Sequence, residues 1–135
     1  SVCRVMEIMD RERLAVGSRL GLSLITEFED ATANYKSDRT YESLYDVLHN
    51  SPVYGGHGAD SPKSLAHRYL SEDVPYLLVP VSQFGAATGV PTPVIDSVIT
   101  LAEALNGVSY RQAGRSLEKM GLGGMAVSDI VGNIF

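Results

Sequence analysis

The residues best suited to chemistry lie close together in the middle of the chain. His67, Arg68, Tyr69, Glu72 and Asp73 fall within seven residues, between a glycine-rich segment and an apolar one. Arg68 carries a planar guanidinium that can bind a carboxylate, of the protein or of a substrate, through two parallel hydrogen bonds. Asp73 could orient a histidine ring and stabilise its protonated form. This catalytic interpretation requires Arg68 and Asp73 to face one open pocket.

A structural interpretation of the same residues is nearly as simple. Arg68 and Asp73 could pair with each other as a clamp, with Asp73 acting as the N-cap of the next helix. His67 fits a surface or core position as well as a catalytic one, and Tyr69 and Tyr76 are expected to pack rather than to act as acids. The residue pattern leaves both interpretations open.

Other kinds of site find little support in the sequence. Cys3 is the only cysteine, and the three histidines are scattered along the chain, so no zinc arrangement is expected. Residues 55–58 and 121–124 are rich in glycine, but neither segment has the preceding strand and the spacing of a phosphate-binding loop. We expect neither a metal site nor a cofactor-binding site in this chain.

Apolar residues at three- and four-residue spacing predict the elements that must position these side chains. In the first half they predict a helix over 2–20 ended by Gly21, a second from Leu22 to about residue 34 with Ser23 as cap, and a third over 40–49. Residues 50–62 are dense in glycine and proline, which predicts a loop.

The second half continues in the same way. We expect a buried helix over 75–88, which Pro80 could kink, and the clearest helix over 94–105, with Thr92 as its N-cap and a wholly buried apolar face. Two further helices are predicted over 109–120 and 125–133. The sequence therefore predicts one all-α domain over residues 1–135 with about six or seven helices.

Composition limits the classes of function. The chain has 135 residues, 44% of them hydrophobic, a net charge of -5 and a pI near 5.1. Lysine and arginine are not concentrated anywhere, so we expect no nucleic acid and no membrane as a partner. The lone cysteine and the charged start, which is unlike a signal peptide, favour a cytoplasmic protein. The chain does not begin with Met, which favours a fragment of something longer.

The candidate site also carries a resemblance. Residues 67–76 (HRYLSEDVPY), followed by VP at 79–80 and GVPTPVID at 89–96, are similar to the helical C-terminal domain of the octopine/nopaline (opine) dehydrogenase family. Residues 10–13 with 20–21, and residues 114–122, resemble flanking segments of that family in the same order. The resemblance covers nearly the whole chain.

This resemblance implies the substrate domain of a two-domain enzyme whose N-terminal Rossmann domain binds NAD or NADP. The implied reaction joins an amino acid to an α-keto acid through an imine that a hydride reduces. Arg68 matches the substrate-binding arginine of the family, and Asp73 matches the aspartate that partners the catalytic histidine. That histidine belongs upstream of the matched segments, so His49, His57 and His67 do not take its role. We expect the chain alone to be inactive.

Two alternatives remain. The chain could be a non-enzymatic helical interaction module, for example one that forms a homodimer, and it would then expose a contiguous apolar patch. It could also be the helical domain of a related keto-acid or hydroxy-acid reductase.

Overall fold

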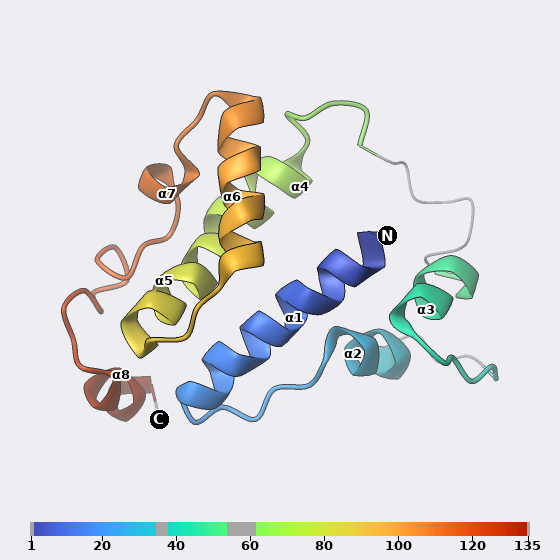
Figure 1. Ribbon diagram of the computed structural model, residues 1–135, viewed down its shortest axis with the longest axis horizontal. Coiled ribbons are helices and arrows are strands. Elements are labelled where there is room, and N and C mark those ends of the chain that lie inside the picture. The colour runs from blue at the N-terminus through green and yellow to red at the C-terminus, as the bar shows by residue number, and fades with distance from the viewer. Residues whose placement is uncertain (1, 35–37, 54–61, 135) are drawn as a thin grey trace.

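The computed structural model describes residues 2–34, 38–53 and 62–134 (Figure 1). In this part of the chain every regular element is a helix, which confirms the all-α prediction. The elements are α1 (Val2–Arg19), α2 (Glu27–Asn34), α3 (Leu44–Asn50), α4 (Arg68–Ser71), the π-helix η1 (Val74–Leu78), α5 (Val79–Thr88), α6 (Pro93–Asn106), α7 (Tyr110–Ala113) and α8 (Val127–Ile134). None of these helices is both long and apolar enough to cross a membrane.

Helix α1 runs through the middle of the molecule, with η1, α5 and α6 on one side and α2 and α3 on the other (Figure 1). The largest buried cluster joins η1, α5, α6 and α7. Its members are Val74, Val79, Ile95, Ile99, Ala102 and Tyr110. A second cluster joins the end of α1 to α8, and a third joins α2 and α3. Helix α1 therefore holds two halves of the domain together.

The first three helices correct the predicted boundaries. Helix α1 matches the prediction and ends before Gly21, whose φ of 77° suits glycine. The second helix starts at Glu27, not at Leu22, because Thr26 and Glu29 form a capping box there. Helix α3 starts at Leu44, because the Ser43 side chain accepts a hydrogen bond from the backbone N–H of Asp46.

Prolines shape the helix predicted over 75–88. It begins one residue earlier as the π-helix η1, in which the N–H of Val79 donates to Val74 O, five residues back. Pro80 has no N–H to continue that spacing, and the chain proceeds as α5. The helix ends at Gly89, where φ is 73°, as predicted. Tyr76, expected to pack, is instead 45% exposed.

The last third of the chain departs most from the prediction. Helix α6 confirms the expected span, but Leu101 and Leu105 on its predicted core face are more than half exposed. The helix predicted over 109–120 is limited to α7, four residues long, because the chain turns away at Gly114 with extended backbone angles. Helix α8 lies where a final helix was expected. Of the predicted loop over 50–62, residues 54–61 lie outside the described residues.

Candidate functional site

A cleft of about 440 Å³ opens between α1, η1 and α5. Its lining combines apolar side chains with a few charged ones: Met6, Met9, Asp10, Arg13, Glu27, Asp73, Leu77, Leu78, Val81 and Ile95. A cleft of this size, mostly apolar with a few polar groups, is typical of a site for a small molecule.

Asp73 is the sequence-predicted site residue that lines this cleft. It directly precedes η1 and is partly buried, but its side chain makes no capping hydrogen bond to that helix. Its carboxylate makes no hydrogen bond or ion pair with any described residue. Asp73 therefore stands at the N-cap position of η1 without capping it through its side chain, and its carboxylate is available to another group.

Arg68 lies elsewhere. It is exposed at the start of α4, outside the cleft lining, and its guanidinium carbon lies 5.9 Å from the centroid of the Tyr69 ring. Among the described residues no ion pair joins Arg68 to Asp73 or to any other acid. The predicted clamp is thus absent from the structure. Of the two residues expected to face one pocket, only Asp73 lines the cleft.

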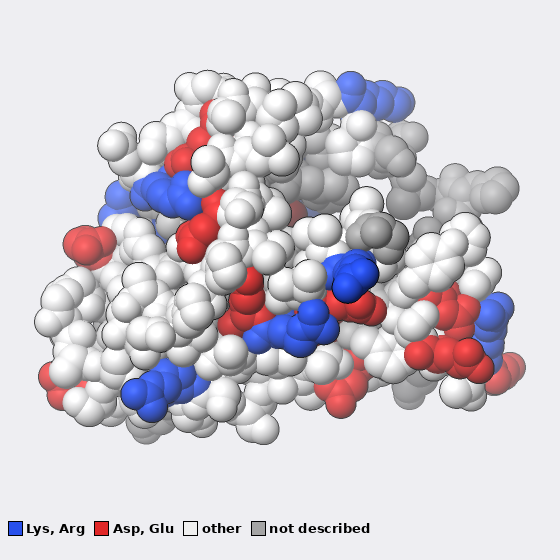
Figure 2. Space-filling model, viewed as in Figure 1, with Lys and Arg blue, Asp and Glu red and all other residues white. Residues whose placement is uncertain are grey.

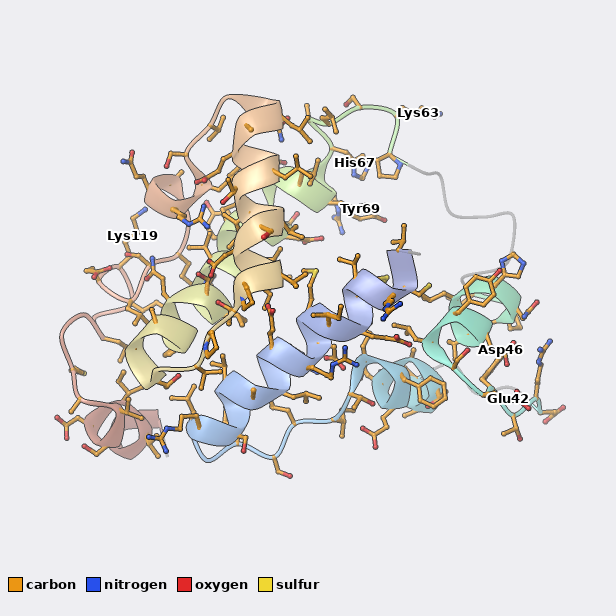
Figure 3. The ribbon with its side chains drawn as sticks, in the orientation of Figure 1. Glu42, Asp46, Lys63, His67, Tyr69 and Lys119 are labelled. Atoms are coloured by element: carbon orange, nitrogen blue, oxygen red, sulfur yellow. The ribbon has the colours of Figure 1, made fainter. Side chains whose placement is uncertain are left out.

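The histidines have local partners. The Nδ1 atom of His67 accepts a hydrogen bond from the N–H of Tyr69 at 3.4 Å, and the two rings meet edge to face 4.5 Å apart (Figure 3). The exposed His49 ring stacks on Tyr45. His57 lies outside the described residues. Tyr69, expected to pack, is half exposed.

The charges at the cleft are mostly acidic. Arg13 donates from Nε and Nη2 to Asp10 Oδ1, at 3.0 and 2.7 Å, and its Nη2 also donates to the backbone oxygen of Ile25 at 2.6 Å. The second oxygen of Asp10 accepts the N–H of Glu27 at 2.9 Å. These bonds occupy both Arg13 and Asp10. The Glu27 carboxylate, like that of Asp73, has no partner among the described residues.

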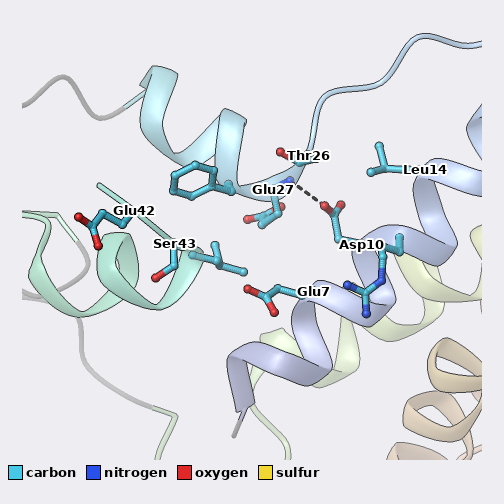
Figure 4. A pocket seen from close by; sticks show the side chains of 10 residues that line it. Glu7, Asp10, Leu14, Thr26, Glu27, Glu42 and Ser43 are labelled. Carbon is cyan, nitrogen blue, oxygen red and sulfur yellow. Dashed lines mark hydrogen bonds between the residues drawn. The ribbon is translucent and has the colours of Figure 1, made fainter. Parts of the chain in front are cut away.

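A second cavity of about 420 Å³ lies between α1, α2 and the start of α3 (Figure 4). Asp10 and Glu27 line it too, together with Glu7 and Glu42. Elsewhere, acidic and basic side chains are interspersed over the face seen in Figure 2. Among the described residues, no group of three or more His, Cys, Asp and Glu side chains could hold a metal ion.

The carboxyl groups with displaced pKa values lie outside the cleft. A backbone hydrogen bond from Thr26 lowers the pKa of Glu29, a side-chain hydrogen bond from Asn50 lowers that of Asp46, and a backbone hydrogen bond from Arg111 lowers that of Glu103. Each of these groups holds a helix end or a turn. Their lowered pKa values therefore report structural hydrogen bonds rather than acid–base chemistry.

Sequence reasoning identified Asp73 but missed the rest of the cleft. The spacing of Asp10 and Arg13 predicts an ion pair on one helix face, yet nothing in it shows that Glu27 and η1 meet that face. These residues come together only because α1 passes between η1 and α2.

Comparison with known proteins gives consistent matches. A family model described as NAD/NADP octopine/nopaline dehydrogenase, alpha-helical domain, matches residues 1–106. The chain is 35% identical over 130 residues to the opine dehydrogenase of Arthrobacter sp. (strain 1C), covering 96% of this chain and 35% of that protein. It is 32% identical over 122 residues to the vitopine synthase of Allorhizobium ampelinum, covering 90% and 32%.

A third relative is the D-nopaline dehydrogenase of Agrobacterium tumefaciens (strain T37), 28% identical over 130 residues, which cover 96% of this chain and 30% of that protein. The chain thus spans about a third of the length of the curated relatives it matches.

Proposed function

Because the chain belongs to the octopine/nopaline dehydrogenase family, whose alpha-helical domain it matches, we propose that it forms the substrate-binding part of an NAD- or NADP-dependent opine dehydrogenase. In the proposed reaction, the amino group of an amino acid attacks the carbonyl carbon of an α-keto acid, and water leaves to give an imine. Transfer of a hydride and a proton to the C=N bond then gives a secondary amine that carries two carboxylates.

The observation that carries this proposal is the free carboxylate of Asp73 at an apolar cleft of amino-acid size. A carboxylate without a partner is costly wherever it is removed from water, so a site that keeps one half-buried needs a cationic group to complete it. A protonated histidine from the rest of the enzyme would supply that group, which is the role that the resemblance implies for Asp73.

Arg68 fits the role of binding a substrate carboxylate. Its guanidinium is exposed and forms no ion pair among the described residues, so it is free to bind a substrate carboxylate through two hydrogen bonds. Its place outside the cleft lining suits a substrate that extends from the cleft toward α4. Two such hydrogen bonds hold the bound substrate in one orientation relative to the second reactant, which the condensation requires.

The dinucleotide does not fit this part of the chain. The described residues contain no β-strand, so they offer no strand, glycine-rich turn and helix to hold a pyrophosphate. We assign NAD or NADP to no residue of this chain. In the proposal a Rossmann domain in the remaining two-thirds of a family enzyme binds it, the substrates are an amino acid and an α-keto acid, and the enzyme works in the cytoplasm.

The substrate-binding role of Arg68 is tested by steady-state kinetics of the full-length natural protein. Arg68→Ala is expected to raise the KM of one carboxylate substrate roughly ten- to a hundredfold, because a hydrogen bond to a charged group contributes about 1.5–3 kcal/mol. Arg19→Ala, which removes another exposed arginine, is the matched control and should leave KM unchanged. An unchanged KM for both substrates in Arg68→Ala would exclude the binding role.

The catalytic role proposed for Asp73 is tested by comparing two variants, one at Asp73 and a control at the adjacent Glu72. Asp73→Asn keeps the shape of the side chain but removes its charge, and kcat should fall about a hundredfold or more, as expected for loss of acid–base catalysis. Glu72→Gln removes an adjacent, exposed carboxylate that does not line the cleft, and it should have little effect. Equal rates for the two variants would argue against Asp73 as a catalytic residue.

A further inference from the structure

The segment that follows α6 folds back over the helices that form the cleft. We name residues 110–119 the C-terminal strap. The Arg111 guanidinium donates to Glu103 on α6 at 2.7 Å, and the N–H of Leu117 donates to Gln83 on α5 at 2.7 Å. The strap lies beyond residue 106, where the match to the family model ends. Its role is therefore not implied by that match.

The strap also completes η1. In that helix the N–H of Val79 bonds to Val74 O, and Pro80 has no N–H to offer to the oxygen of Pro75. Pro75 O would thus be left without a partner inside the helix. It accepts the backbone N–H of Arg115 at 2.9 Å. The strap supplies the hydrogen bond that Pro80 cannot donate to Pro75.

This contact requires glycine at position 114. A Cβ built there would overlap Pro75 O, and it would lie 2.7 Å from the oxygen of Tyr110 and 2.9 Å from Pro75 Cα. The φ of Gly114 is -71°, so its backbone conformation is open to any residue. Glycine is needed here because the strap approaches η1 so closely and because the Tyr110 oxygen, in the strap itself, leaves no room for a Cβ.

Lys119 holds the turn of the strap that contains Gly114. The Lys119 Nζ donates to the backbone oxygens of Gln112, Ala113 and Gly114, at 2.7, 2.9 and 2.9 Å. One ammonium group thus fixes the turn that follows α7, beside which it lies in Figure 3. Because this turn is held and the strap is bonded to Glu103 on α6 and Gln83 on α5, a side chain added at Gly114 would press on η1.

The residues of η1 on either side of Pro75 line the cleft. Asp73 precedes it, and Leu77 and Leu78 follow it, all three in the cleft lining. A shift of Pro75 must therefore move part of the cleft wall. Displacements of about 1 Å in a binding site can reduce turnover a hundredfold.

We propose that the C-terminal strap is a positioning element, which sets the η1 wall of the substrate cleft through the contact of Gly114 with Pro75. This inference rests on the proposed function for its kinetic consequence. The structural claim, that the strap holds η1 in place, does not depend on any enzymatic activity.

The test compares Gly114→Ala with Gly132→Ala in the natural protein. Gly132 is exposed, and a Cβ there would meet nothing within 4 Å, so it is the matched control. Gly114→Ala should speed amide hydrogen exchange over residues 76–81 and lower kcat/KM for the amino acid about tenfold, because the displaced wall carries both Asp73 and the apolar lining of the cleft. Gly132→Ala should change neither.

Lys119→Met provides a milder variant should Gly114→Ala fail to fold. It removes three hydrogen bonds from the strap, so it should change the exchange rate over residues 76–81 and the kinetics in the same direction, by about a third as much. Lys119→Arg keeps the positive charge and should lie closer to wild type in both measurements. Folded variants with unchanged exchange would overturn the proposal, and so would faster exchange with an unchanged kcat/KM. If the wild-type protein has no opine dehydrogenase activity, the proposed function fails, and the exchange experiment decides whether the strap holds η1.

Discussion

Helices α2 and α6 both begin against a carboxylate of α1, but they depend on it differently. At α2, Thr26 Oγ1 accepts the N–H of Glu29 at 3.0 Å, and the Glu29 carboxylate accepts the N–H of Thr26 at 2.7 Å. Asp10 of α1 adds one further bond, to the N–H of Glu27. Helix α2 thus carries its own cap and receives a second one.

Helix α6 has no cap of its own. Thr92 stands at the N-cap position, as predicted, but its hydroxyl donates to the Asp96 carboxylate and accepts no backbone N–H. The two oxygens of Glu12, on α1, accept the N–H groups of Val94 and Ile95, each at 2.9 Å. A residue more than eighty positions away thereby replaces the local cap. A local cap belongs to one helix, whereas a distant one also fixes how two helices pack.

This difference predicts the largest effect for Glu12→Ala. The substitution leaves two backbone donors of α6 unsatisfied and unties α6 from α1, which should cost about 2–3 kcal/mol of unfolding free energy. Urea unfolding followed by circular dichroism measures it. The control is Glu7→Ala, which removes an exposed α1 carboxylate that has no hydrogen-bond partner among the described residues. A loss no larger than that of Glu7→Ala would mean that α6 does not depend on this cap.

The local cap should matter less. Thr26→Ala removes the capping box of α2 and should cost about 1 kcal/mol, since Asp10 still holds the N–H of Glu27. Thr92→Val keeps the buried shape of its side chain and should cost about half as much, because the lost hydrogen bond is not a cap. The same unfolding experiment compares them. If Thr92→Val proved the more damaging, the assignment of the α6 cap to Glu12 would be wrong.

The smallest effect concerns the far end of α6, where Glu103 holds the strap. The backbone N–H of Arg111, at 2.8 Å, lowers the pKa of Glu103 from its ordinary value of 4.5. A lowered folded-state pKa stabilises the protein above 4.5, and this contribution is lost as the pH falls through the folded-state pKa.

Glu103→Gln should therefore lower the melting temperature slightly at neutral pH and by progressively less below pH 4.5. Melting curves of the two proteins across that range measure the difference. A gap between them that stays constant with pH would show that the charge of Glu103 contributes nothing.

Local patterns predicted much of the fold. The spacing of apolar residues gave α1, α5 and α6 with ends near the observed ones, and Gly89 and Gly107 mark helix ends with positive φ. The capping box of Thr26 and Glu29 is also a local signal, a Thr followed three residues later by a Glu, so the sequence alone could have predicted the start of α2. All of these signals act within one or two helical turns.

The sequence by itself determined that this protein is helical, which residues start and end most helices, and that Asp73 was a candidate for chemistry. Only the tertiary structure decided which groups Asp73 joins at the cleft, that Arg68 stands outside it, and that the predicted helix over 109–120 becomes a strap. The physical reason is the range of the interactions. Helix ends are set by neighbours three or four residues away, whereas Glu12 at α6 and Gly114 at Pro75 meet only when distant segments pack together.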